Sequence, residues 1–323
     1  MTRLMMKTAL GVIVMTGMLS AGTHRADSHA PIGVMTDHMH KKGELMTSAR
    51  YMTMTMTDLR QAKTDIADSA APGAMVPLDM TMKMSMFGMM YGVSDTVTVM
   101  GMGSLVMNDM SMQVRATDAI RDSGVYEIGD IKLGTMVRLK KTETFNSHFG
   151  MMVSLPTGAV NHSSGGSTVG YGMQPGSGTV DLNPSLTLNW VGERSSAGVQ
   201  TSALLRTGQN HVGYTLGQKV EATAWWAKVL HQNLSGSLRA IGTIDTGVTG
   251  SHDGIPNAAM SIALNPDNTG RKRAMIGLGL NAAFLKWNHF RPSIEVLIPI
   301  YEDVTGIQFK TEPFIIFGST FTY

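Results

Sequence analysis

The chain has 323 residues, no cysteine, 15% charged residues and a formal net charge of +2. The lack of cysteine excludes disulfide scaffolds, thiolate zinc sites and cysteine nucleophiles, and the near-balanced charge argues against a nucleic-acid partner. Glycine, at 36 residues, exceeds its usual share of about 7% and weakens helix interiors, so we expect a strand-rich protein with many turns.

Residues 1–26 have the pattern of a secretory signal peptide. Arg3 and Lys7 form a positively charged start, an apolar run follows, and small residues come next. The apolar run is too short for a stable transmembrane helix. We therefore expect Sec export, with cleavage within 21–26. No later stretch is long and apolar enough to predict a transmembrane helix, which leaves a periplasmic β-protein or an outer-membrane barrel.

Alternation of apolar and polar residues with a period of two predicts twelve strands. Short connections alternate with long polar ones, such as 107–126 and 302–312, as in outer-membrane barrels. The even number of strands predicts that both chain ends lie on the periplasmic side. The predicted strands are 44–57, 77–93, 96–106, 127–139, 145–155, 179–191, 196–207, 218–230, 234–246, 272–285, 292–301 and 313–323.

The chain end supports a barrel. From Phe314 to Tyr323, aromatic side chains alternate with small or polar ones, which is typical of a final strand facing lipid, although an ordinary half-buried strand is the alternative. We expect the barrel-assembly machinery to recognise this strand ending at Tyr323. The predicted fold is all-β: a transmembrane antiparallel up-and-down β-barrel of 12 strands in the Gram-negative outer membrane. A periplasmic segment 27–43 precedes the barrel 44–323.

Charged residues indicate which face of each strand lines the lumen, because a charge facing lipid near the midplane costs about 2–4 kcal/mol. The set has both signs with a modest cationic excess. It either borders an open aqueous path or forms a salt-bridge network that fills a narrow barrel, and both alternatives are open. The charges assigned to the lumen are Arg50, Asp130, Lys132, Arg138, Arg206, Glu221, Arg239, Arg273 and Glu295.

Methionine is concentrated in the first third of the chain. Of the 29 methionines, 23 lie within residues 1–112, and five of those belong to the predicted signal peptide. Most of the others alternate along the first three strands, on the face that also carries Arg50. The methionines assigned to the lumen are Met52, Met54, Met56, Met82, Met84, Met86, Met100 and Met102.

Upstream of the first strand, His38, Met39 and His40 form a candidate metal site. Thioether and imidazole bind soft cations, so Cu(I) or Ag(I) is the expected ion. Two alternatives compete with metal handling. Methionine also serves as an adaptable filler or as a sliding surface for apolar solutes, and His38 and His40 then are ordinary polar residues. No other cofactor is expected.

Five segments resemble one bacterial envelope family, and the resemblance covers residues 29–323. The family consists of proteins labelled transporters of the meta-pathway of phenol degradation (MetA-type). It implies an outer-membrane β-barrel that exports or takes up aromatic compounds, and it assigns no role to single residues. The segments are HAPIGVMTDHMHKKGELM (29–46), MTMKMSMFGMMYGVSDTVTVM (80–100), IGDIKLGTMVRL (128–139), SLPTG (154–158) and GSGTVDLNPSLT (176–187).

The leading functional prediction is an outer-membrane channel or transporter for small solutes, among them aromatic or hydrophobic compounds. The alternatives are a copper- or silver-handling outer-membrane protein and a structural barrel without transport. We expect no enzyme and assign no catalytic residue, because the chain lacks the G-x-S-x-G elbow. His148 and Ser154 lie near each other in the sequence, but pairing them as a hydrolase site requires geometry that the sequence does not supply.

Overall fold

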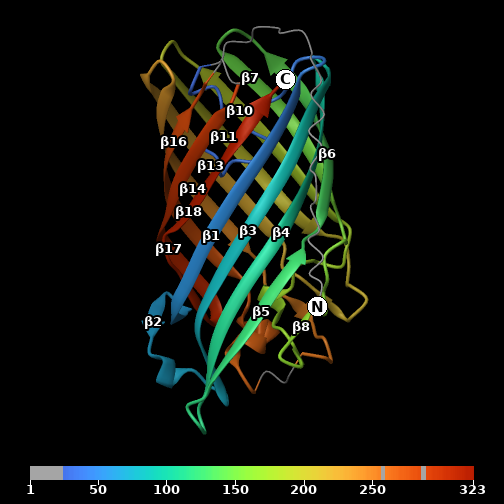
Figure 1. Ribbon diagram of the computed structural model, residues 1–323, viewed down its shortest axis with the longest axis vertical. Helices are drawn as coiled ribbons and strands as arrows, with labels where there is room; N and C mark the ends of the chain where they lie inside the picture. The colour runs from blue at the N-terminus through green and yellow to red at the C-terminus, as the bar shows by residue number, and fades with distance from the viewer. Residues whose placement is uncertain (1–24, 256–258, 285–288) are drawn as a thin grey trace, which may run out of the picture.

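The computed structural model describes residues 25–255, 259–284 and 289–323. The predicted signal peptide therefore lies almost wholly outside the described residues. Within them, no helix is long and apolar enough to cross a membrane. Twelve long strands form a closed antiparallel barrel, in which the first strand, β1, pairs with the last, β18 (Figure 1). The predicted fold class is thus confirmed.

The wall strands follow one another around the barrel in chain order, and small elements lie between them. The wall consists of β1 (Leu45–Ala62), β3 (Met75–Ser94), β4 (Val97–Val114), β6 (Ile131–Lys141), β7 (Phe145–Leu155), β10 (Asp181–Val191), β11 (Ser195–Arg206), β13 (Lys219–His231), β14 (Leu234–Asp245), β16 (Arg271–Ala282), β17 (Arg291–Thr311) and β18 (Phe314–Thr322). The smaller elements are β2 (Thr64–Ile66), β5 (Ile120–Ile128), β8 (Ser163–Ser164), β9 (Ser167–Thr168), β12 (Tyr214–Thr215), β15 (Thr249–Gly250) and four short 3-10 helices: Asp68–Ala70, Tyr171–Met173, Ile262–Leu264 and Pro266–Asn268.

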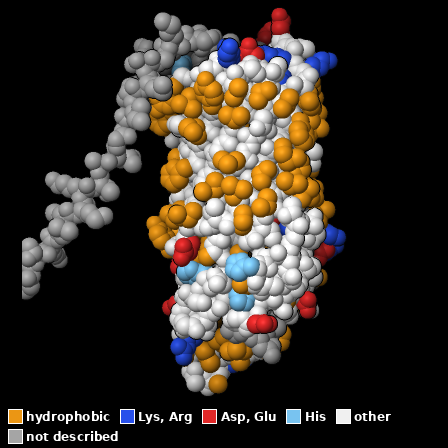
Figure 2. All heavy atoms as spheres, turned by 90° about the vertical axis from the view of Figure 1, so that its right-hand side faces the viewer, with side chains coloured by type: hydrophobic (Ala, Val, Ile, Leu, Met, Phe, Trp, Pro, Cys, Tyr) orange, Lys and Arg blue, Asp and Glu red, His pale blue; other side chains and the backbone are white. Residues whose placement is uncertain are grey.

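The outer face of the wall is apolar. Side chains of the outward parity are exposed, with Phe87 at 61%, Leu133 at 50% and Leu278 at 52% of their surface. Figure 2 shows apolar side chains spread over the wall, with charged side chains gathered toward the two ends. A belt of this kind meets lipid in outer-membrane barrels.

Short turns and long loops occupy opposite ends of the barrel. Asp95 and Thr96 alone join β3 to β4, and the C-terminus lies at the same end as these short turns. The small strands β2 and β8 lie at the other end (Figure 1). By the convention of outer-membrane barrels, short turns mark the periplasmic end and long loops the extracellular end.

One long connection proves to be mostly strand. The stretch 107–126 was expected to be a loop, but β4 continues to Val114 and β5 returns beside it. The register runs from Gln113 opposite Ile120 to Leu105 opposite Ile128. The prediction was wrong here because the polar side chains of this hairpin extend beyond the apolar belt, where the apolar signal of a strand is lost.

The prediction of a long loop at 302–312 is also wrong. The chain turns at Gly306, whose φ of +68° lies in the left-handed region that favours glycine. The segment after the turn then pairs with β1, from Ile307 opposite Gln61 to Thr311 opposite Met56. The last connection is thus a tight turn, and β1 closes the barrel against both β18 and the end of β17.

The segment before β1 enters the barrel. Residues 25–44, here called the N-terminal plug, overlap the expected segment 27–43, which was placed on the periplasmic side. In the structure the plug folds back into the lumen, and Ala26, Val34 and Asp37 are buried against the inner wall. Polar side chains on the inner wall supply the hydrogen bonds that a buried backbone requires.

Candidate functional site

The plug is held mainly through its backbone. Side chains from several wall strands donate to its carbonyl oxygens, so no plug side chain is needed for these bonds. The bonds join Ser235 Oγ to Ala26 O (3.0 Å), Ser196 Oγ to Asp27 O (2.6 Å), Gln200 Nε2 to Met35 O (2.8 Å), His148 Nε2 to Thr36 O (2.8 Å) and Asn189 Nδ2 to Asp37 O (2.7 Å). The His148 ring thus bonds a plug carbonyl.

A buried charge network meets the plug at Gly33. Arg239 Nη1 lies 3.3 Å from Glu295 Oε2, and Arg239 Nη2 lies 3.2 Å from Glu221 Oε1. Gly33 N donates to Glu295 Oε2 at 2.9 Å. A Cβ at Gly33 would lie 2.6 Å from that oxygen and closer still to Arg239, so a larger residue there would require the Arg239 and Glu295 side chains to shift.

The other lumen charges that the sequence predicted also lie inside. Arg50 contacts Met35 Sδ of the plug, and Arg206 pairs with Asp181. Asp130 accepts from the backbone N–H groups of Gly158 and Ser177, both at 2.9 Å. The remaining three line internal cavities: Lys132, Arg138 and Arg273.

Parity reasoning did not single out several buried charges. Asp181 is fully buried at the start of β10, and Arg291 and Glu302 are also buried. Arg291 fell in a predicted turn and Glu302 in a predicted loop, so the alternation rule was never applied to them. Asp181 does share the parity of Asn183 and Ser185, and this signal was available.

Methionines form one wall of a cavity of about 500 Å³ between the plug and the extracellular loops. Met54, Met56 and Met82, all predicted to face the lumen, line it, and Met80, Met110, Met173 and Phe309 extend the apolar wall. Met110 and Met173 lie in stretches that the sequence predicted to be loops. The opposite wall carries Arg206, Lys219, Asp245, Arg271 and Arg273.

The other predicted methionines lie deeper in the barrel. Met84, Met86 and Met102 line a neighbouring cavity of about 250 Å³. Met52 packs against a buried apolar cluster that contains Ile32 of the plug. Met100 stands opposite Met90 in the β3–β4 register and is half-buried. The thioether face therefore runs from the plug to the extracellular loops.

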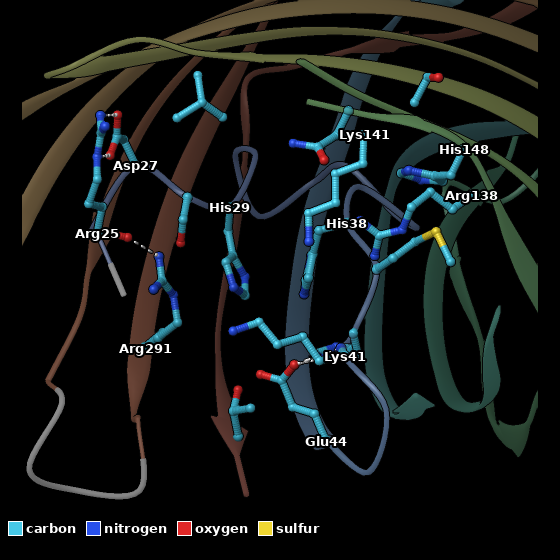
Figure 3. Close-up of a pocket in the computed structure, with 17 residues that line it drawn as sticks. Arg25, Asp27, His29, His38, Lys41, Glu44, Arg138, Lys141, His148 and Arg291 are labelled. Atoms are coloured by element: carbon cyan, nitrogen blue, oxygen red, sulfur yellow. Dashed lines mark hydrogen bonds and ion pairs between the residues drawn. The ribbon is translucent and has the colours of Figure 1, made fainter. Parts of the chain in front are cut away.

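The predicted metal residues meet at the periplasmic mouth. His38, Met39 and His40 line a cavity of about 480 Å³ together with His29 and Glu44. In Figure 3 the rings of His29 and His38 lie side by side and point into this cavity, with their centroids 4.0 Å apart. His29, which lies nine positions before His38 in the same upstream segment, joins the three predicted residues.

Burial changes the pKa values of the histidines at this mouth. Burial, followed by the charge of Arg291, lowers the pKa of His29 well below its usual value. Burial also lowers the pKa of His40, against the opposing effect of its hydrogen bond to Glu44. Both imidazoles are therefore neutral at neutral pH, the form that offers a lone pair to a cation.

Known proteins share the fold of this chain rather than its sequence. No family model matches it, and no curated protein matches it. The crystal structure of an outer membrane channel from Pseudomonas putida F1 gives a TM-score of 0.64 at 11% identity, over 89% of this chain and 98% of that chain. The Pseudomonas putida toluene transporter TodX gives 0.43 at 9% identity, over 88% and 90%. The NanC porin gives 0.40 at 7%, over 84% and 98%.

The likeness to the Pseudomonas putida F1 channel shows that this chain has the fold of an outer-membrane channel. Together with the apolar belt, it places the protein in the outer membrane of a Gram-negative bacterium. At 11% identity the likeness concerns the fold alone, and membership of the phenol-pathway family stays a prediction.

Proposed function

We propose that the protein is an outer-membrane channel for small apolar solutes, aromatic compounds among them. The observation that carries this proposal is the methionine-walled cavity between the plug and the extracellular loops. Its volume of about 500 Å³ falls in the range of sites that hold small molecules, about 300–1,000 Å³. Thioether side chains are flexible and polarizable, so they adapt to different apolar shapes and contact aromatic rings favourably.

The opposite wall favours a solute with an acidic group. Arg271 pairs with Glu302, and Lys219 pairs with Glu221. Arg273 donates to Thr311 Oγ1 at 3.1 Å, and among the described residues it forms no ion pair with a carboxylate. A phenolate or an aromatic carboxylate would place its ring on the methionine wall and its charge near Arg273. This agrees with the solute class that the resemblance to phenol-pathway transporters implies.

Two further parts belong to the proposal. The plug closes the periplasmic end of the path, so release of a solute requires the plug to shift. The last strand, which ends at Tyr323, is recognised by the barrel-assembly machinery. A structural barrel without transport is the competing function, and the transport measurement below separates the two.

Uptake of an aromatic fluorescent probe by cells tests the channel. Each Met→Gln change puts an amide against the apolar solute and costs about 1–3 kcal/mol of binding, so a Met80→Gln/Met110→Gln variant should take up the probe at least about tenfold more slowly. Met260→Gln is the matched control, because Met260 lies outside the cavity lining and is 40% exposed. Equal uptake with and without the protein contradicts the channel and favours a structural barrel.

A further inference from the structure

Three histidines converge inside the plug. One ligand atom from each of His29, Asp37 and His38 lies within 4.8 Å of the others. The His38 ring also meets the His40 ring edge-on, with centroids 4.9 Å apart. Ligands around one tetrahedral ion stand about 3.3 Å apart when metal–nitrogen bonds are about 2.0–2.1 Å, so binding of one ion requires His29 and His38 to approach each other and the His40 ring to turn toward them.

Two of these rings are oriented by carboxylates. His38 Nδ1 lies 2.9 Å from Asp37 Oδ1, and Ala30 N holds the other oxygen of Asp37 at 2.9 Å. His40 Nδ1 lies 3.4 Å from Glu44 Oε2. A carboxylate on one ring nitrogen, which fixes the tautomer and raises the basicity of the other nitrogen, is typical of histidines that ligate metal.

The second nitrogen of each ring is unused. Among the described residues, Nε2 of His38 and Nε2 of His40 are buried and have no hydrogen-bond partner. The His40 side chain is only 3% exposed, so its free nitrogen has little access to bulk water. An unsatisfied buried polar atom costs about 1–3 kcal/mol, and a bound cation would remove that cost for both rings.

We propose that His29, His38 and His40 bind one divalent transition-metal ion, Zn²⁺ by preference, and that the ion locks the N-terminal plug in the barrel. Imidazole nitrogens supported by carboxylates suit Zn²⁺ and Cu²⁺, so this donor set replaces the Cu(I) or Ag(I) expected from the sequence. Met39 also lines the cavity and is the residue through which a soft ion would compete.

The local charges decide between binding and repulsion. Arg291 faces His29 and disfavours a cation there, but its Nη2 donates to the carbonyl oxygens of Arg25 and Ala26. Asp37 and Glu44 supply two negative charges directly behind the rings. Arg25, Lys41, Arg138 and Lys141 also line the cavity, so an ion of charge +2 depends on Asp37 and Glu44, the two carboxylates that contact the imidazoles, for local compensation of its charge.

The ion would join two separate parts of the plug. His29 lies near its start, whereas His38 and His40 lie close to β1. Linking them closes a loop that contains Gly33 and Met35, the stretch that bonds Glu295 and Gln200 of the wall. The metal would thus stabilise the docked conformation, in which all three histidines are close together.

Metal binding to the purified mature protein in detergent tests the site directly. Wild type should bind one Zn²⁺ per chain by equilibrium dialysis and calorimetry. We expect loss of binding in His29→Ala and His38→Ala, and a decrease of about tenfold in affinity for Glu44→Gln, which removes only an orienting charge. His211→Ala alters an exposed histidine and should bind normally. Binding that survives the His29→Ala/His38→Ala/His40→Ala variant overturns the proposal.

A second measurement tests the lock and keeps the proposal testable if a histidine variant folds poorly. The chain has no cysteine, so Val34→Cys introduces a single thiol at a position that is 2% exposed in the docked plug. Zn²⁺ should slow its modification by a maleimide at least about tenfold, while Ser251→Cys in an extracellular loop reacts unchanged. An equal rate with Zn²⁺ and with chelator overturns the lock.

The same binding measurements with Ag(I), and with Cu(I) under reducing conditions, provide the comparison with soft ions. Tight binding of Ag(I) that Met39→Leu abolishes, with no Zn²⁺ bound, overturns the divalent site and restores the soft-metal prediction. The metal site does not depend on the channel function, so solute uptake without metal binding, or the reverse, tells the two failures apart.

Discussion

The two halves of the lumen are built from different chemistry. At the periplasmic end, amide, hydroxyl, imidazole and guanidinium groups of the wall meet the backbone of the N-terminal plug. At the extracellular end, thioethers of β1, β3 and β4 border open space. Hydrogen-bonding side chains hold a polypeptide in place, whereas thioethers offer nothing for a backbone to bond. The side chains of the wall therefore determine which part of the barrel is filled by the chain itself.

The largest effect should come from the charge network under the plug. Arg239→Met leaves Glu295 buried and without its partner, which costs about 3–5 kcal/mol. Urea titration of the protein in lipid vesicles measures the loss in the free energy of unfolding. Arg239→Met/Glu295→Met should recover most of it, since no buried charge is left unpaired. Lys63→Met disrupts an exposed pair with Asp303 and should change stability by less than about 1 kcal/mol.

Removing the plug should leave the periplasmic half of the lumen as open as the extracellular half. A variant that lacks residues 27–40 should conduct at least about tenfold more current in planar bilayers, because a small barrel is closed by what fills it. Deleting 163–168, which contains the β8–β9 hairpin at the opposite end, is the control and should leave the plug in place. An unchanged conductance after plug deletion would show that the loops close the path instead.

Lowering the pH should weaken docking of the plug in the periplasmic half of the lumen. The docked plug holds His29 and His40 with pKa values below 6.5, so an undocked plug binds more protons and docking weakens as pH falls through 6.5. Arg291, Asp37 and His38 face His29. From about pH 7 to pH 6, protonation of His29 should favour release about threefold, and protonation of His40 should act in the same direction. With chelator present, the labelling rate of Val34→Cys relative to Ser251→Cys measures this.

The matched variant for the pH experiment is His29→Gln/His40→Gln. It should show a smaller change in the relative labelling rate over the same pH interval. A pH response of unchanged size in this variant would assign the effect to other groups.

The strands were predictable because lipid imposes a strict pattern on them. Most outward side chains of the wall strands are apolar, so alternation was visible even in the strand that contains Glu221. The pattern ends where the strands leave the membrane. The ends of β4 and β17 therefore looked like loops, although both are paired.

The lumen was predictable only in part. Parity showed which way Met54 or Arg239 points, but it did not show what fills the space beyond. The plug has no periodicity, since it is held by backbone bonds to side chains on many strands. His29 and His38 become neighbours only through the turn between them, which depends on the approach of Gly33 to Glu295.

The docking of the plug also has a consequence for biogenesis. Its backbone partners come from strands as early as β3 and as late as β17, so the complete set of partners exists only after the final strands have been added. A half-assembled barrel cannot hold the segment, and the first described part of the chain is among the last to find its position. We therefore expect docking of the plug to accompany completion of the wall.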